Sequence, residues 1–232
     1  MPMILDCTLR DGGHQNNWNF DDEFVFNLIS KLKNENIDYC EIGYRNNKDR
    51  AGKGRFFFCD KLLLEKFVKN KSNLKIGIMA DYKRIDLNDF ISAENDLVDF
   101  VRIACHPDKI LPSLELCETL KSRGYNIFLQ LMEITALANE HYNILEKWNN
   151  KDILEGLYIA DSYSIAEPND IPLYFSRLRN SGYSKISFHA HNNKGLALKN
   201  TLKAVECGAY SIDVSQNGLG GNLNFEDYKN SL

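Results

Sequence analysis

The stretch ILDCTLRDGGH, residues 4–14, runs from apolar residues directly into charged ones. Residues 3–8 are mostly apolar and predict a short buried β-strand. Arg10, Asp11 and His14 follow where this strand ends, and the two glycines between them permit a loop. Because parallel α/β proteins place their chemistry at the carboxyl ends of strands, the stretch indicates both how the fold begins and where a functional site is expected.

Strand-like and helix-like segments alternate about eight times along the chain. We expect strands at residues 3–8, 38–43, 74–80, 97–105, 125–132, 156–160, 185–189 and 210–215. Helices are expected at residues 21–34, 60–70, 87–94, 111–123, 137–149, 171–180, 195–207 and 223–232. Because each crossover returns the chain in the same direction, this order predicts a parallel (β/α)8 TIM barrel with a shortened final helix.

Length and composition are those of one globular domain. The chain has 232 residues, of which 44% are hydrophobic and 26% charged, and we expect residues 1–232 to form a single domain. The alternative architecture is an open doubly wound sheet, which normally carries a glycine-rich phosphate loop after its first strand. Neither G-x-G-x-x-G nor the Walker pattern occurs there, so the barrel is favoured.

Charge and apolar patterning argue against several classes of partner. The net charge is −4 and no sustained basic run occurs, so nucleic-acid binding is not expected. No apolar run approaches the roughly 18 residues that cross a bilayer, so no membrane association is expected. The amino terminus enters a strand pattern without a leader-like segment, which favours a cytoplasmic protein. Apolar barrel surface beside a short last helix would favour a homodimer.

Six cysteines are scattered through the chain without any C-x-x-C pair. Most lie in apolar runs, where a free cysteine behaves as a small hydrophobic residue. We therefore expect reduced, mostly buried thiols and no zinc site built from cysteine.

A second stretch with chemistry, HAHN at residues 189–192, ends the seventh expected strand. His189 and His191 are two residues apart in a strand and therefore project to the same side. In a closed barrel of eight strands the first and seventh lie two apart around the mouth, so Asp11 can meet this pair. Two imidazoles and one carboxylate form a face that binds a divalent cation and leaves positions open for substrate and water.

Three motifs together resemble the signatures of the DRE-TIM metallolyase superfamily. They are TLRDG at residues 8–12, HAHN at residues 189–192 and GLGGNL at residues 218–223. The superfamily includes 3-hydroxy-3-methylglutaryl-CoA lyase, isopropylmalate and homocitrate synthases, the carboxyltransferase domain of pyruvate carboxylase, and 4-hydroxy-2-oxovalerate aldolase. The resemblance covers nearly the whole chain. It is most similar to the aldolase branch, because His14 follows the aspartate of the first motif by three residues.

The resemblance implies a metal centre. Asp11, His189 and His191 would be metal ligands, and Asn222 would be an additional ligand or lie just behind them. Mn or Mg is the favoured divalent cation, with Zn and Co compatible, because the ligand set combines oxygen and imidazole donors.

The resemblance also implies two catalytic groups. Arg10 would neutralise the enolate of pyruvate as it forms, and His14 would move the proton of the hydroxyl group at the bond being broken. This chemistry suits the residue types, because a divalent cation and a fixed guanidinium both stabilise an enolate. A base that works near neutral pH is most often histidine.

Four residues at other strand ends are candidate substrate-binding groups. Glu41 and Arg45 follow the second expected strand, Arg102 lies in the fourth, and Ser162 follows the sixth. A structural ion pair is an equal alternative for Glu41 and Arg45, and a capping role is the alternative for Ser162. The polar insert at residues 45–55 is expected to be a loop that covers a site.

The sequence thus predicts a divalent-metal-dependent carbon–carbon lyase or aldolase acting on a small-molecule 2-oxo acid derived from pyruvate. Two alternatives stay open, namely an acyl-CoA-dependent Claisen-type synthase of the same superfamily and a metal-binding barrel that serves as a non-catalytic scaffold. Two departures from the superfamily pattern matter. Ser164 stands where many relatives carry glycine. The carboxy-terminal helical segment through which the aldolases meet a dehydrogenase is not expected, nor is channelling to such a partner.

Overall fold

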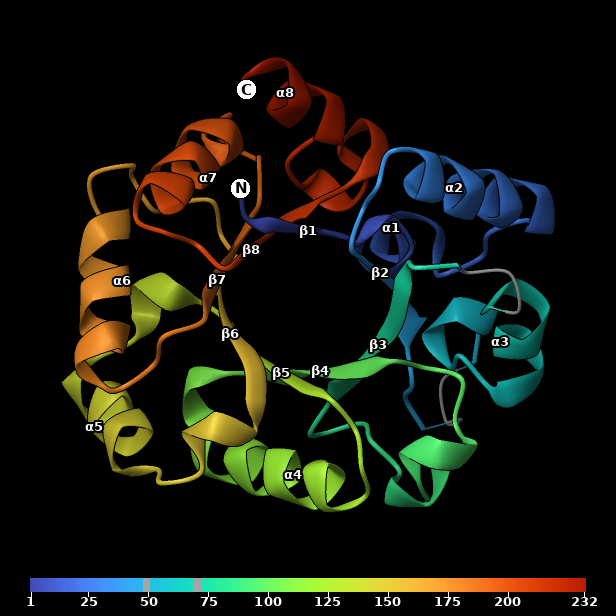
Figure 1. The fold of residues 1–232 in the computed structure, drawn as a ribbon, viewed down its shortest axis with the longest axis horizontal. Coiled ribbons are helices and arrows are strands. Elements are labelled where there is room, and N and C mark those ends of the chain that lie inside the picture. The colour runs from blue at the N-terminus through green and yellow to red at the C-terminus, as the bar shows by residue number, and fades with distance from the viewer. Residues whose placement is uncertain (48–50, 69–71) are drawn as a thin grey trace.

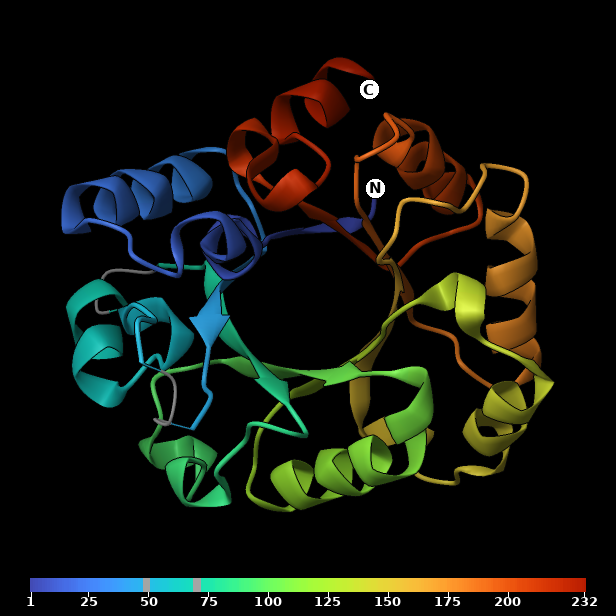
Figure 2. The same ribbon diagram turned by 180° about the vertical axis from the view of Figure 1, so that it is seen from behind.

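Eight parallel strands close into a barrel in chain order in the computed structural model, which describes residues 1–47, 51–68 and 72–232 (Figures 1 and 2). The strands are β1 (Met3–Asp6), β2 (Tyr39–Tyr44), β3 (Lys75–Asp81), β4 (Phe100–Cys105), β5 (Ile127–Leu131), β6 (Leu154–Asp161), β7 (Ile186–Ala190) and β8 (Ser211–Val214). The ring closes where β1 pairs with β8. The prediction of a (β/α)8 barrel is therefore confirmed, and the open doubly wound sheet is wrong.

Helices surround the barrel on its outer side (Figure 1). They are α1 (Thr8–Asn16), α2 (Asp22–Asn34), α3 (Lys61–Val68), α4 (Ile110–Ser122), α5 (Asn139–Lys147), α6 (Ile171–Asn180), α7 (Ala197–Glu206) and α8 (Phe225–Asn230). Asp21 caps α2 by accepting a hydrogen bond from the backbone N–H of Phe24, as its position predicts. The last helix is short, with six residues. None of the helices in the described ranges has the length and apolar character needed to cross a bilayer.

The loop expected after the first strand is wrong, because helix α1 begins almost at once. Asp6 starts it by accepting hydrogen bonds from both the backbone N–H and the hydroxyl of Thr8, at 3.0 and 2.8 Å. The glycines serve packing instead of a turn: a Cβ at Gly13 would lie 2.1 Å from Cδ1 of Trp18. The helix ends at Asn17, which has a left-handed φ of 56°. In both views α1 lies between α2 and the strands β1 and β2 (Figures 1 and 2).

The helix expected at residues 87–94 is also wrong. Two short 3-10 turns, η2 (Leu87–Asp89) and η3 (Ala93–Asn95), connect β3 to β4. Between them Phe90 leaves the helical conformation and is completely buried, with the guanidinium of Arg45 lying 4.9 Å from its ring centroid. Burial of this ring against a cation overrides the helical spacing of the sequence.

The interior of the barrel divides into an apolar layer and a charged layer. A separate cluster of Leu5, Cys7, Phe100, Phe128 and Tyr158 is completely or almost completely buried. Phe100 and Phe128 lie at the beginning of their strands, so this apolar layer fills the amino-terminal end of the barrel. Buried charged side chains lie beyond it, toward the carboxyl ends of the strands: Arg10, Asp11, Glu41, Arg102, His189 and Asp213.

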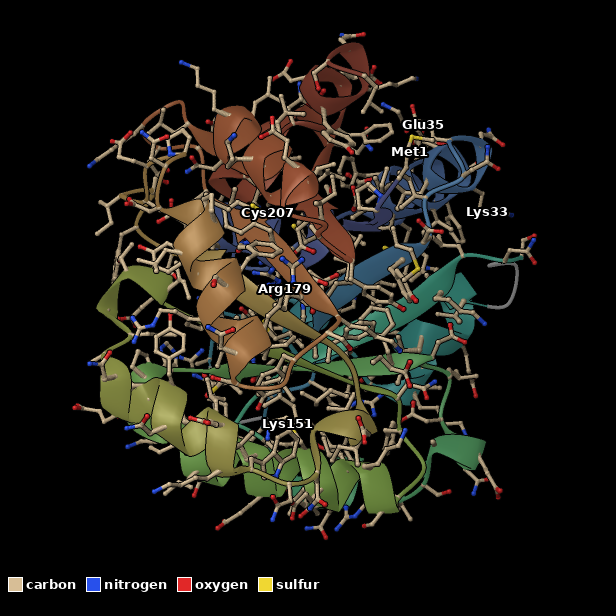
Figure 3. All side chains as sticks on the ribbon, turned by 60° about the vertical axis from the view of Figure 1, so that its left-hand side comes forward. Met1, Lys33, Glu35, Lys151, Arg179 and Cys207 are labelled. Atoms are coloured by element: carbon tan, nitrogen blue, oxygen red, sulfur yellow. The ribbon has the colours of Figure 1, made fainter. Side chains whose placement is uncertain are left out.

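All six cysteines are free, and five of them are buried. Cys207 is half-buried at the end of α7, where its carbonyl oxygen accepts a hydrogen bond from Arg179 of α6 (Figure 3). The expected pattern of scattered, mostly buried cysteines is therefore observed.

Candidate functional site

Three side chains from opposite ends of the chain meet at the carboxyl ends of the strands. Asp11 belongs to α1 and His189 to β7. His191 follows directly after the last residue of β7, Ala190. The Nε2 atoms of the two imidazoles lie 3.2 Å apart, and they lie 3.4 and 4.0 Å from Oδ2 of Asp11. The set is buried except for the partly exposed His191. The structure thus brings together the residues that the sequence pairs.

A carboxylate behind the cluster fixes the orientation of His189. Oδ2 of Asp213, on β8, lies 2.7 Å from Nδ1 of His189, and both side chains are almost completely buried. A carboxylate at this distance accepts a hydrogen bond from Nδ1–H, which favours the tautomer whose Nε2 is an electron-pair donor on the side of Asp11. Sequence reasoning missed Asp213. The only signal was an acidic residue in the middle of a strand expected to be buried.

The charges of Asp11, His189 and their neighbours favour the binding of a cation between these side chains. Burial alone would raise the pKa of Asp11, but Arg10 and His189 hold the pKa of this carboxyl well below its usual range. Burial and the neighbouring His189 lower the pKa of His191 to about 4, so this imidazole is neutral at pH 7. For His189 the effect of Asp11 and Asp213 exceeds that of burial and raises the pKa. Two carboxylates around one buried imidazole therefore attract positive charge to this point.

Two buried oxygen atoms near the cluster lack a hydrogen-bond partner within the described residues, as expected for ligands of a metal ion. Oδ2 of Asp11 and Oδ1 of Asn222 are buried, and neither makes a hydrogen bond within the described part of the chain. Asn222 lies beside His191 through a β-bridge, and its Nδ2 donates to the carbonyl of Leu219 at 3.1 Å, which leaves Oδ1 as the free atom. Buried polar atoms without partners are costly unless a ligand satisfies them. One carboxylate, two imidazoles and one amide oxygen suit a divalent cation.

Two guanidinium groups share one carboxylate beside the cluster. Nε of Arg10 donates to Glu41 at 2.5 Å, and Nη1 lies 2.7 Å from Asp11. Arg102 donates to Glu41 and, at 2.6 Å, to Asp213. These ion pairs are buried, so removing one partner would leave a charge uncompensated. Nη2 of Arg10 differs from the rest, because it is buried and makes no hydrogen bond to any described residue. A buried cationic donor of this kind can bind an anion.

His14 lies at the outer edge of the cluster. Its Nε2 is 3.9 Å from Oδ1 of Asp11, and its side chain is 56% exposed, so a substrate can reach it. Its ring packs edge-on against Trp18 with 4.7 Å between ring centroids. Burial lowers the pKa of His14, with Arg10 among the cations that add to this effect and Asp11 opposing it. The imidazole is therefore neutral at pH 7 and able to accept a proton.

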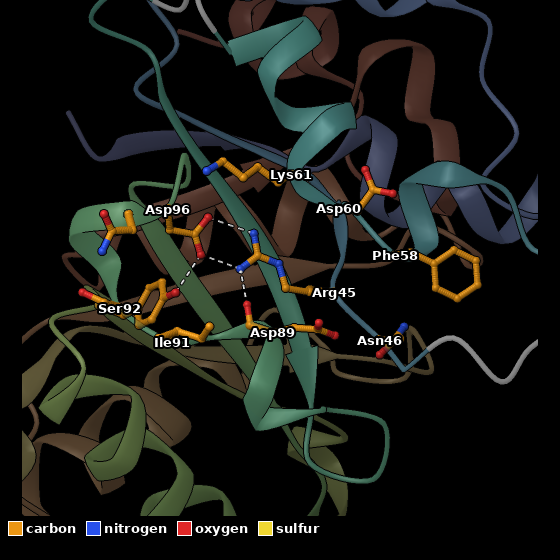
Figure 4. Close-up of a pocket in the computed structure, with 11 residues that line it drawn as sticks. Arg45, Asn46, Phe58, Asp60, Lys61, Asp89, Ile91, Ser92 and Asp96 are labelled. Carbon is orange, nitrogen blue, oxygen red and sulfur yellow. Dashed lines mark hydrogen bonds and ion pairs between the residues drawn. The ribbon is translucent and has the colours of Figure 1, made fainter.

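Two of the residues predicted to bind substrate make their contacts elsewhere. Arg45 forms a two-point ion pair with Asp96, at 2.5 and 3.0 Å, beside a pocket of about 480 Å³ that lies against the β3–β4 connection (Figure 4). Ser162 accepts a hydrogen bond from the backbone N–H of Glu133 at 3.0 Å. No contact of either residue with Asp11, His189 or His191 occurs among the described residues. Of the insert at residues 45–55, residues 48–50 lie outside the described ranges.

Ser164 adopts the conformation that explains glycine in the superfamily pattern. Its φ is 54°, a left-handed value that costs energy for residues other than glycine. The hydroxyl oxygen of Ser164 accepts a hydrogen bond from the backbone N–H of Asn193 at 3.1 Å, which ties the β6 loop to the segment after His191. Asp161 supports the same turn by accepting from the backbone N–H groups of Ile165 and Ala166.

Comparison with known proteins places these features in a family. The oxaloacetate decarboxylase of Mycobacterium tuberculosis is 26% identical over 97% of this chain and 68% of its own length. A 4-hydroxy-2-oxovalerate aldolase of Carboxydothermus hydrogenoformans is 26% identical over 94% of this chain and 65% of its own length. This chain thus spans about two thirds of the length of these curated relatives.

A solved structure is similar over almost the whole chain. The N-terminal domain of a presumed aldolase from Bacteroides vulgatus superposes with a TM-score of 0.89 and 30% identity, covering 99% of this chain and 79% of that one. The HMGL-like family model matches residues 1–228, which include β1 with its charged helix, the histidine pair and Asn222. The chain belongs to the HMGL-like family.

Proposed function

We propose that this protein is a divalent-metal-dependent carbon–carbon lyase or aldolase acting on a 2-oxo acid derived from pyruvate. The observation that carries the proposal is the convergence of Asp11, His189 and His191 beside the unpaired Nη2 of Arg10. The names of the relatives, an oxaloacetate decarboxylase and several 4-hydroxy-2-oxovalerate aldolases, support a substrate of this class.

The proposed metal site consists of Asp11, His189 and His191, with Asn222 as a further oxygen donor. A divalent cation held there would act as a Lewis acid toward the 2-oxo acid. We favour Mn or Mg because half of the donors are oxygen atoms, and Zn and Co are compatible with the imidazoles.

The protein's own groups would divide the remaining work. Nη2 of Arg10 would donate to the oxygen on which negative charge grows as pyruvate becomes its enolate, and burial makes this hydrogen bond stronger than in water. Glu41 holds Arg10 in place through Nε. The neutral imidazole of His14 would take the proton of the hydroxyl group at the bond that breaks, and would return it in the reverse reaction.

The metal requirement provides the first test. Protein freed of divalent cations by a chelator is expected to lose cleavage of 4-hydroxy-2-oxo acids and to regain it with Mn or Mg. Asp11→Asn is expected to lower kcat by at least about a hundredfold, since a ligand and its charge are lost. Full activity in the stripped protein or in Asp11→Asn would refute the proposal.

His14 separates aldol cleavage from decarboxylation. Oxaloacetate loses carbon dioxide to form the same enolate, but no hydroxyl proton has to be removed in that reaction. His14→Ala is therefore expected to reduce aldol cleavage by about 10²–10⁴-fold, the usual contribution of a general base, and to spare decarboxylation. Release of free CoA from acyl-CoA and a 2-oxo acid would instead favour the synthase alternative.

A homodimer and a cytoplasmic location remain predictions from the sequence.

A further inference from the structure

A lysine near His14, Lys53, contacts only neutral groups within the part of the chain that the structure describes. Nζ of Lys53 donates to Oδ1 of Asn17 at 2.8 Å and lies 4.9 Å from the ring centroid of Trp18 and 5.9 Å from that of Phe57. All these contacts are to neutral groups, and within the described ranges no acidic side chain pairs with it. Three other lysines, Lys66, Lys109 and Lys203, each pair with an aspartate or glutamate. The ammonium group of Lys53 thus lies half-buried among neutral groups of the described ranges.

Trp18 places this charge next to the proposed base. The same indole that lies under Lys53 packs edge-on against the ring of His14. The indole itself is 3% exposed and is fixed by a hydrogen bond of 2.9 Å from Nε1 to the carbonyl of Arg10. Lys53 is therefore held close to the end of α1, the helix that carries Asp11. Its hydrogen bond to Asn17 and its contact with the fixed indole of Trp18 keep the ammonium group near the site.

A second cation lies on the same side of the barrel mouth. The carbonyl of Arg84, beyond β3, accepts a hydrogen bond of 2.6 Å from the backbone N–H of Asn47, just beyond β2. Its guanidinium Nε lies 3.6 Å from Asp81, a distance at which the pair is loose. Because Arg84 already has Asp81 as a neighbour, Lys53 is the better placed of the two cations to bind an anion.

We propose that Lys53 binds an anionic group at the far end of the substrate, so that the aldehyde released or consumed carries a carboxylate or a phosphate. The inference rests on the proposed function. In that reaction the bond between C3 and C4 of a 4-hydroxy-2-oxo acid breaks, its electron pair stays on the pyruvate fragment, and the hydroxyl proton passes to His14. His14 would contact the C4 hydroxyl, and the proposal places the carbons after C4 on the side of its ring where Trp18 and Lys53 lie.

The choice of the aldehyde that is condensed with pyruvate, the acceptor, tests this inference. Pyruvate is condensed with a neutral aldehyde, butanal, with a carboxylate-bearing one, succinic semialdehyde, and with a phosphate-bearing one, glycolaldehyde phosphate. The protein is expected to favour at least one anionic acceptor by about tenfold or more in kcat/KM, the usual effect of a charged hydrogen bond. Added salt should reduce this preference, because exposed charges are screened. The two anionic acceptors show which oxyanion the site takes.

Lys53→Met assigns the preference to this residue. Its ratio of kcat/KM for the better anionic acceptor over butanal is expected to fall by about tenfold. Lys199→Met, at an exposed position of α7, is the matched control and should keep the ratio of the unmodified protein. An equal loss on all acceptors in Lys53→Met, or a preference for butanal in the unmodified protein, would overturn the inference.

Exchange of the methyl protons of pyruvate in deuterated water separates this inference from the proposed function. The exchange needs the enolate but no aldehyde. Exchange without any preference for anionic acceptors would overturn the role of Lys53 alone. Absence of exchange in the metal-loaded, unmodified protein would overturn the proposed function, and this inference with it.

Discussion

His189 lies between two carboxylates that have different tasks. Asp11 faces its Nε2 and Asp213 faces its Nδ1. Asp213→Asn keeps an oxygen that can accept from Nδ1 but loses the negative charge that makes the imidazole a better donor. We expect metal affinity to fall by about 10–100-fold, which competition with a chromogenic chelator measures. Asp161→Asn, a buried carboxylate bound to backbone N–H groups of a turn, is the control. Equal affinities of Asp213→Asn and the unmodified protein would contradict the assignment.

The buried carboxyl group of Asp6 is expected to make the free energy of unfolding depend on pH. Burial raises its pKa from 3.8 to about 7, although the hydrogen bonds from Thr8 oppose the shift. The folded protein therefore holds a proton that the unfolded chain loses, and stability falls as pH rises from about 4 to about 7. Asp6→Asn removes this contribution. Its free energy of unfolding, relative to that of the unmodified protein, should rise over this range by an amount on the order of 4 kcal/mol at most. Urea titrations at pH 4.5 and 8 check it, and a difference independent of pH would contradict the shift.

Helix α1 shows what the sequence can and cannot predict for an element. Hydrophobic spacing located all eight strands, because buried parallel strands read as short apolar runs. It did not predict α1, because Gly12 and Gly13 suggest a turn, whereas the structure uses the smallness of Gly13 to admit Trp18. It also predicted a helix around Phe90, where burial of the ring prevails. Such contacts between segments leave no periodic trace in the sequence.

The candidate site shows the same division. Asp11, His189 and His191 could be paired from the sequence because a two-residue spacing and barrel topology bring them together. The sequence left Arg45 open between a substrate contact and a structural ion pair, because whether a residue at a strand end faces the barrel or the outer layer depends on its register. Here β2 contains an irregularity between Glu41 and Gly43 that changes the register. Glu41 faces the interior and pairs with Arg10, whereas Arg45 pairs with Asp96.

Gly12 and Gly13 are neighbours in α1, so replacing each by alanine compares the effect of an added Cβ at two positions of the same helix. A Cβ at Gly13 would clash with Trp18, whereas a Cβ at Gly12 would lie 3.2 Å from Cβ of Leu219, a tight contact that a small shift of Leu219 relieves. Gly13→Ala is therefore expected to destabilise the protein by roughly 1–3 kcal/mol, the usual cost of overpacking. Gly12→Ala should be nearly neutral, because an alanine gains about 0.5–1 kcal/mol in a helix. Urea unfolding followed by tryptophan fluorescence measures both. Equal effects would contradict the packing role of Gly13.

At the scale of the whole molecule, the proposed ligands join the two ends of the chain. Asp11 belongs to the first βα unit, while His189, His191 and Asn222 belong to the last two, and β1 pairs with β8 to close the ring. A cation bound by all of them would hold the barrel closed at this seam. Ligand binding to the folded state alone stabilises it by about 2.7 kcal/mol at a hundredfold excess over the Kd. We therefore expect Mn or Mg to raise the melting temperature by several degrees.

Two variants show whether this stabilisation comes from the proposed ligands. Asp11→Asn should lose most of the rise in melting temperature caused by the metal, because it lacks the only carboxylate of the set. His14→Ala should keep the rise, because its imidazole lies 3.9 Å from Asp11 on the outer side and is not among the proposed ligands. Differential scanning calorimetry with and without the metal compares the three proteins. A full rise in Asp11→Asn would place the cation elsewhere, and a lost rise in His14→Ala would make this residue a ligand instead of a base.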